Sequence, residues 1–246
     1  MKRTFDLLAS LAGLICLAPI LFIFMFLIWK QDRHSPLYIA KRVGLNGREF
    51  NMVKLRSMVK NADANGVDST SSNDMRITKI GHMIRRFKLD EIMQLWNVLL
   101  GDMSLVGPRP NVRRETDLYT DLEKKLLTVR PGITDISSIV FSDEGDILSG
   151  KSDPDISYHQ LIRPGKSKLG LFYIAQSGFL LDLYLILLTC VAIISKPKAL
   201  NLLTAKLRQL NASEELLLIA SRAQELIPSP PPGSLNIVTS RDGAVQ

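Results

Sequence analysis

The feature that most constrains this chain is an apolar segment close to its N-terminus. Residues 7–29 form a run of about 23 uncharged residues, long enough as an α-helix to cross the hydrocarbon core of a bilayer. The run is long for the apolar part of a signal peptide, and no small-x-small cleavage site follows it. The sequence therefore predicts a membrane anchor attached to a body that faces the cytoplasm.

The residues in and around this segment leave its path through the membrane open. Pro19 lies in the middle, where it removes a backbone hydrogen bond and favours a kink. Lys2 and Arg3 precede the segment, and Lys30 and Arg33 follow it. Positive charge on both flanks gives a spanning helix no clear orientation, whereas a re-entrant helix that returns to one face satisfies both flanks. These residues support the spanning and the re-entrant forms equally.

Composition indicates the kind of partner. The net charge of +7 predicts anionic partners, either nucleic acid or an anionic lipid surface with phosphorylated ligands. The apolar segment favours the lipid surface, and the chain has no helix-turn-helix or zinc pattern. Cys16 and Cys190 both lie in apolar stretches, so no disulfide framework is predicted.

Residues 36–58 have the pattern of a β-hairpin. Asn46-Gly47 is a strong turn signal between two stretches that alternate apolar and polar residues. Lys54 and Arg56 alternate with apolar neighbours, so both cations are expected on one face of the second strand. That face could be solvated or could bind phosphate.

The rest of the chain is predicted to be mostly helical, in an α+β fold. Residues 77–87 have a helical apolar period and basic residues on another face, which suits either the membrane interface or packing on the protein's own core. The apolar stripe of residues 89–101, which includes Trp96, is interpreted as core packing. Residues 111–129 are expected to form a polar helix, and residues 153–165 a polar connection in which Tyr158 and His159 are given no role.

Three units are expected along the chain: a membrane anchor over 1–30, a catalytic domain with interfacial helices over 31–195, and a C-terminal helix with a disordered tail over 196–246. The apolar helical stretch 169–194 contains Asp182 and is predicted to lie in the membrane plane or to pack on the anchor, because its uncharged part is short for a span.

Two neighbouring acids stand out in the middle of the chain. Asp90 and Glu91 begin a short apolar helix, just after the basic residues Arg85 and Lys88 and before a glycine-proline turn with Arg109. Paired carboxylates beside cations can bring a divalent metal and a phosphate together. The same two acids could simply complement the positive end of the helix, and spacing alone favours that interpretation.

Three stretches in one order change this balance. KLRSM at 54–58, LDEIMQLWNVLLGDMSLVGPRP at 89–110 and RPGIT at 130–134 resemble the bacterial sugar transferase family, the monotopic phosphoglycosyl transferases, and the resemblance extends over residues 2–195. It implies an anchor that bends at Pro19 and re-enters the same face. The chain departs from the family pattern at Ala18, where many members have serine, and at Lys88 and Met93 beside the acidic pair.

The resemblance implies an enzyme that transfers a sugar-1-phosphate from a nucleotide sugar, in the first place a UDP sugar, to polyprenyl (undecaprenyl) phosphate. Asp90 would be the nucleophile that forms a covalent phosphosugar intermediate, and Glu91 would assist through metal binding or proton handling. Mg²⁺ would be the cofactor, with both acids as its ligands. The phosphate contacts implied are, in order of preference, Arg109 and Lys54, then Arg56, Arg85 and Arg130.

The partners implied are a nucleotide sugar, polyprenyl phosphate and the lipid bilayer, with no nucleic acid, and with homo-oligomerisation as an open expectation. The expected location is the bacterial inner membrane with the catalytic domain on the cytoplasmic side, in exopolysaccharide or lipopolysaccharide assembly. Residues 135–148 differ from the commoner family pattern, so the sugar is not indicated. Two alternatives stay open: a non-catalytic adaptor that binds anionic lipid, and a nucleic-acid-binding membrane regulator, which the missing motifs disfavour.

Overall fold

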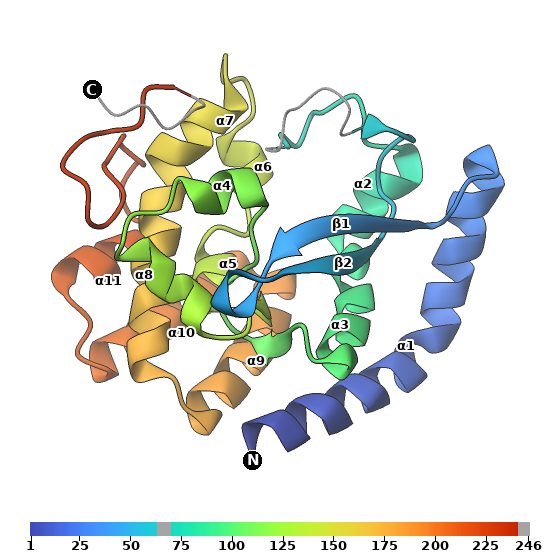
Figure 1. Cartoon of the computed structure of the whole chain (residues 1–246), viewed down its shortest axis with the longest axis horizontal. Coiled ribbons are helices and arrows are strands. Elements are labelled where there is room, and N and C mark those ends of the chain that lie inside the picture. Colours follow the sequence, from blue (N-terminus) through green and yellow to red (C-terminus); the bar gives the residue numbers. More distant parts are fainter. Residues whose placement is uncertain (63–69, 241–246) are drawn as a thin grey trace.

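The computed structural model describes residues 1–62 and 70–240, which form a mostly helical body beside a long N-terminal helix (Figure 1). The helices are α1 (Lys2–Asp32), α2 (Lys79–Arg86), α3 (Gln94–Leu100), α4 (Arg113–Asp117), α5 (Ile136–Val140), α6 (Glu144–Ile147), α7 (Pro154–Ser157), α8 (Arg163–Gln176), α9 (Phe179–Ile194), α10 (Lys196–Gln209) and α11 (Glu214–Ser221). The strands are β1 (Leu37–Val43), β2 (Glu49–Leu55), β3 (Ser104–Val106) and β4 (Gly132–Thr134). The α+β, mostly helical prediction is confirmed.

Helix α1 is the membrane candidate that the apolar segment predicted. Within residues 1–62 and 70–240 it is the one helix long and apolar enough to cross a bilayer by length and composition, and only 11% of its most apolar window is buried. A core helix of a soluble protein would be mostly buried. Pro19 lies inside α1, and the helix changes direction along its length (Figure 1). Loss of one backbone hydrogen bond at proline accounts for such a bend.

Polar contacts fasten the first turn of α1 to the body. Lys2 forms an ion pair with the buried Asp182 of α9, and its Nζ also donates to the carbonyl of Val106 over 3.1 Å. The buried Asp6 accepts a 2.8 Å hydrogen bond from the hydroxyl of Ser104. The acidic residue that interrupts the apolar helix α9 is therefore the partner of the N-terminal lysine.

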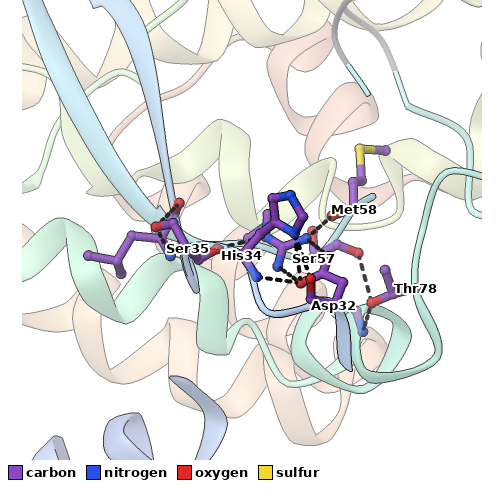
Figure 2. Close-up of polar contacts among 9 residues, drawn as sticks. Asp32, His34, Ser35, Ser57, Met58 and Thr78 are labelled. Carbon is purple, nitrogen blue, oxygen red and sulfur yellow. Dashed lines mark hydrogen bonds and ion pairs between the residues drawn. The ribbon is translucent and has the colours of Figure 1, made fainter. Parts of the chain in front are cut away.

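The last turn of α1 is fastened to the same body. Two guanidinium nitrogens of Arg56 each donate to a carboxylate oxygen of Asp32 over 2.6 Å, and the third nitrogen donates to the carbonyl of Ser35 over 2.8 Å. Figure 2 shows Asp32 near Ser57, whose carbonyl accepts a 3.0 Å hydrogen bond from the backbone N–H of Thr78. The end of β2 thus joins the anchor to α2.

The predicted hairpin is confirmed. Strands β1 and β2 pair antiparallel, from Leu37 opposite Leu55 to Val43 opposite Glu49. Asn46 and Gly47 lie in the turn with φ angles of 55° and 74°, the left-handed region that asparagine and glycine adopt most readily.

Three apolar clusters hold the elements together. The largest joins α5 with α8 to α11. A second cluster joins Leu21 and Ile28 of α1 to Leu55 of β2 and Ile84 of α2, so the anchor packs directly on the body. The third packs the hairpin on α3 through Met52 and other residues. In Figure 1, α1 runs along one side of the molecule, α8, α10 and α11 lie on the opposite side, and the hairpin and α3 lie between them.

Two predicted segments, the helix over 111–129 and the polar connection over 153–165, differ from the structure. Residues 111–129 form α4 and a 3₁₀ segment, Glu123–Thr128, rather than one helix, and residues 153–165 are helical through α7 and a π-helical turn, Tyr158–Ile162. Burial explains the second case. The Nε atom of Arg163 donates to Oε1 of the fully buried Glu123 over 3.0 Å. Its Nη1 atom lies 3.3 Å from Nδ1 of His159. The contact with Glu123, 40 positions away in the chain, stabilises a turn that local sequence does not favour.

Three further expectations differ from the structure. Trp96 is 47% exposed on α3, so it is not a core residue. The single C-terminal helix expected within residues 196–246 is in fact two helices, α10 and α11. The segment after α11, which was expected to be disordered, has defined contacts in its described part: Thr120 donates to the carbonyl of Pro232 over 2.5 Å, and Val238 is 2% exposed.

Candidate active site

The two glycine-proline motifs of the sequence pack against each other. Strands β3 and β4 pair in parallel, the N–H of Gly107 donates to Thr134, and the N–H of Gly132 donates to Pro108, each over 3.0 Å. A Cβ on Gly132 would lie 2.1 Å from the nitrogen of Gly107, so only glycine permits this approach. The crossing places Arg109 directly after β3, where its side chain meets Glu91.

An unusual turn sets the acidic pair. Lys88 has a φ of 56°, a left-handed conformation that costs a non-glycine residue about 1 kcal/mol. It separates α2 from a 3₁₀ segment, Leu89–Met93, which continues into α3 without a side-chain cap. The predicted helix thus begins as a 3₁₀ turn, and Asp90 is only 9% exposed.

Glu91 and Arg109 form a partly buried ion pair. The Nη2 atom of Arg109 donates to Oε1 of Glu91 over 2.6 Å. Burial alone would raise the pKa of Glu91, but the charges of Arg109 and Lys88 outweigh it and lower this pKa to about 2. Glu91 in turn raises the pKa of Arg109. Both groups are therefore charged at neutral pH, and the rest of the guanidinium fork makes no other hydrogen bond to the described residues.

Asp90 has a different environment from its neighbour. Burial raises the pKa of its carboxyl group, which the charge of Lys54 opposes and that of Glu91 reinforces. Its Oδ1 atom is buried and has no hydrogen-bond partner among the described residues. A buried carboxylate oxygen without a donor is costly and is characteristic of a group that meets a ligand.

Two more cations face the acidic pair. Burial lowers the pKa of Lys54 on β2 to about 8, and the positive charge of Arg109 adds to the effect. Burial also lowers the pKa of Arg85, which lies within electrostatic reach of Asp90 and donates to the hydroxyl of Ser57 over 3.1 Å. We refer to the residues that gather here as the charged cluster: Lys54, Arg85, Lys88, Asp90, Glu91 and Arg109.

Arg56 and Arg130, also named from the sequence, do not join the charged cluster. Arg56 is only 8% exposed, and its guanidinium group is engaged by Asp32. Arg130 donates to the carbonyl of Gly101 over 3.1 Å, at the opposite end of α3 from Asp90. Both arginines make contacts within the protein, outside the charged cluster.

Three residues near the site were not singled out from the sequence: Gln94, Glu144 and Lys166. Gln94 is fully buried, and neither atom of its amide has a partner among the described residues. Glu144 of α6 forms an ion pair with Lys166 of α8 and lies within electrostatic reach of Arg109. The acidic run at 143–146 was the available signal for Glu144, whereas Gln94 looks like an ordinary helix residue.

Asp90 and Glu91 are suited to hold a divalent cation whose other ligands come from a substrate. Among residues 1–62 and 70–240, no three His, Cys, Asp or Glu side chains converge as metal ligands. Mg²⁺ is commonly held by one or two carboxylates together with substrate phosphates. The unpartnered Oδ1 of Asp90 and the neighbouring Glu91 match that requirement.

Comparison with known proteins identifies the family of the chain. Residues 1–196 match the model of the family described as Bacterial sugar transferase. The chain is 32% identical over 207 residues to the exopolysaccharide production protein ExoY of Sinorhizobium fredii, a match that covers 78% of this chain and 84% of that protein. It is 34% identical over 190 residues to an uncharacterized sugar transferase, EpsL, of Bacillus subtilis, which covers 77% and 85%.

A third relative is named for its substrates. The chain is 38% identical over 170 residues to the undecaprenyl-phosphate galactose phosphotransferase of Salmonella typhimurium, a match that covers 63% of this chain and 34% of that protein. Several other relatives are matched over only 31–38% of their length. The family model covers most of the chain and two relatives are matched along most of their length, so the chain belongs to the bacterial sugar transferase family.

Proposed function

We propose that this protein transfers a sugar-1-phosphate from a nucleotide sugar, in the first place a UDP sugar, to undecaprenyl phosphate. The observation that carries the proposal is the buried Asp90, whose unpartnered carboxylate oxygen lies among the four cations of the charged cluster, in a chain whose helix α1 is long and apolar enough to enter a membrane. The names of the relatives, which include undecaprenyl-phosphate sugar phosphotransferases, support the same substrates.

In the first step, an oxygen of Asp90 attacks the sugar-bearing phosphorus of the donor. The bond from that phosphorus to the bridging oxygen of the diphosphate breaks, and nucleoside monophosphate leaves with the electron pair. Arg109 holds the phosphate oxygens with the part of its guanidinium that Glu91 does not engage, and Lys54 reduces the repulsion between carboxylate and diphosphate. Bound Mg²⁺, held by Asp90 and Glu91, would supply further charge neutralisation.

In the second step, a phosphate oxygen of the polyprenyl phosphate attacks the phosphosugar on Asp90. The carboxylate is released and the lipid becomes a polyprenyl diphosphate sugar, so the enzyme returns to its first state. Splitting the transfer into two displacements allows a water-soluble donor and a membrane-bound acceptor to use one site in turn. The test is to incubate the purified chain with Mg²⁺, undecaprenyl phosphate and a panel of nucleotide sugars, and to measure released nucleoside monophosphate. Failure of every donor would reject the proposal.

The site must lie at the depth of the lipid headgroup, and a re-entrant anchor would place it there. In support, polar contacts tie both ends of α1 to one body: Lys2 to Asp182 and Asp32 to Arg56. We therefore propose that α1 enters the inner membrane, bends at Pro19 and returns to the cytoplasmic face.

This topology predicts a labelling result. In a background without Cys16 and Cys190, single cysteines at the exposed positions Thr4 and Ser35 should both resist an impermeant thiol reagent added to intact cells. Both should react after the membrane is permeabilised, which is the control for accessibility. Labelling of the Thr4 position alone in intact cells would indicate a spanning helix.

The environment of Lys54 predicts a pH dependence. With a pKa of about 8, Lys54 is charged below that pH and neutral above it, so kcat/KM for the donor should fall on the alkaline side near pH 8. Lys54→Arg keeps its charge at higher pH, so this fall should move out of the measured range. Lys41→Arg, at an exposed position on β1, is the matched control and should keep the parent profile. An alkaline fall that is unchanged in Lys54→Arg would assign it to another group.

A further inference from the structure

A second charged pair lies next to Arg109 and has no part in the steps above. A cavity of about 30 Å³ is lined by Arg109, Tyr158 and Lys166, among other residues. Lys166 forms an ion pair with Glu144, and its Nζ lies 5.2 Å from the centre of the Tyr158 ring. The Lys166–Glu144 pair is therefore adjacent to the place where Arg109 is proposed to hold the donor's phosphate.

Helix α6, which carries Glu144, is fixed from two sides. Asp143, the residue before α6, pairs with Lys196 over 2.5 Å and with Arg222 over 3.4 Å. On the other side, the backbone N–H of Ser72 donates to the carbonyl of Gly145 over 2.9 Å. A side chain on an element held in this way keeps a defined position, which recognition of a ligand requires.

The chemistry of the pair favours a neutral polar ligand. Lys166 engages Oε2 of Glu144, whereas Oε1 makes no hydrogen bond with the described residues and the side chain is 32% exposed. Burial would raise the pKa of Glu144, but Lys166 and then Arg109 hold it below its usual value, so the group stays ionised. An ionised carboxylate repels phosphate and accepts strong hydrogen bonds from hydroxyl groups.

We propose that Glu144, held in place by Lys166, accepts a hydrogen bond from a hydroxyl group of the nucleotide sugar whose phosphate Arg109 binds. The inference rests on the proposed function, and it makes Glu144 a residue that selects the donor. Hydroxyl groups of the same chemistry occur on the transferred sugar and on the ribose of the nucleotide, and the experiment distinguishes these two sources.

The experiment measures nucleoside monophosphate released by the full chain with Mg²⁺, undecaprenyl phosphate and the donor that it accepts. Glu144→Gln keeps the size of the side chain and removes its charge, so kcat/KM should fall roughly ten- to hundredfold, the loss expected for one hydrogen bond to a charged group. The matched control is Glu215→Gln. Glu215 pairs over 2.6 Å with Lys168, which lies on the same helix as Lys166, and its replacement should leave kcat/KM within about twofold of the parent.

Donor analogues then identify the hydroxyl. One set lacks single hydroxyl groups of the sugar, and another lacks the 2′-hydroxyl or the 3′-hydroxyl of the ribose. With the analogue that lacks the group bound by Glu144, the parent and Glu144→Gln should differ by less than about threefold, because the hydrogen bond is absent in both. An equal loss with every analogue, or parent-like activity of Glu144→Gln, would overturn this inference and leave the proposed function standing. A parent protein that releases no nucleotide from any donor would overturn both.

Discussion

Replacement of Asp90 by asparagine is expected to abolish the first half-reaction. With nucleotide sugar and Mg²⁺ but no lipid, the parent protein should gain the mass of one phosphosugar and release one equivalent of nucleoside monophosphate. Asp90→Asn should show neither, with release reduced roughly 10⁴-fold or more, because a neutral amide is a far weaker nucleophile than a carboxylate. Intact-protein mass spectrometry and a nucleotide assay measure the two products.

Substitutions at two other acidic residues distinguish the role of Asp90 from a general effect of removing negative charge. Glu91→Gln should slow the step but leave some adduct, since Glu91 assists and its partner Arg109 remains. Asp121→Asn, at an exposed residue that pairs with Lys124, should behave as the parent does. If a fully active preparation forms no adduct and releases nucleotide only after lipid is added, the lipid phosphate attacks directly. Asp90 would then keep at most a role as a metal ligand.

Arg109→Lys is expected to lower kcat/KM roughly ten- to hundredfold while the protein stays folded. Lysine keeps the positive charge but has no planar fork, so it cannot bind Glu91 and two phosphate oxygens together. The measurement is nucleotide release by the variant and the parent, together with thermal unfolding of both. The pairing with Glu91 should survive in part, because the charge that lowers the pKa of Glu91 is retained.

Arg113→Lys is the matched control for this substitution. Arg113 is also paired with a glutamate, Glu49, over 3.0 Å, but it is exposed and is not part of the charged cluster. Its replacement should leave kcat/KM close to that of the parent. If Arg109→Lys retains the turnover of the parent, Arg109 is structural, and the phosphate contact passes to Lys54, since Arg56 is engaged by Asp32.

Local patterns were sufficient for much of the fold. The uncharged run at 7–29 predicted α1, and Asn46-Gly47 predicted the hairpin, because length and turn chemistry depend on residues close together in the chain. The long motif at 89–110 indicated, from the sequence alone, that Asp90 and Glu91 are site residues and that the chain belongs to this family. The π-helical turn and the break between α4 and the following 3₁₀ segment were missed, because distant contacts stabilise them against local preference.

The arrangement of side chains at the site depended on contacts between distant parts of the chain. Alternation along β2 predicted a common face for Lys54 and Arg56, but the strand ends at Leu55, and Asp32, 24 positions away, engages Arg56. Residue types alone could not show that Glu144 lies within electrostatic reach of Arg109. The sequence by itself determined which chemical groups were available and which helix is long and apolar enough to cross a membrane. Only the tertiary structure decided which charges meet and which carboxylate is buried, because both depend on which distant segments the fold brings together.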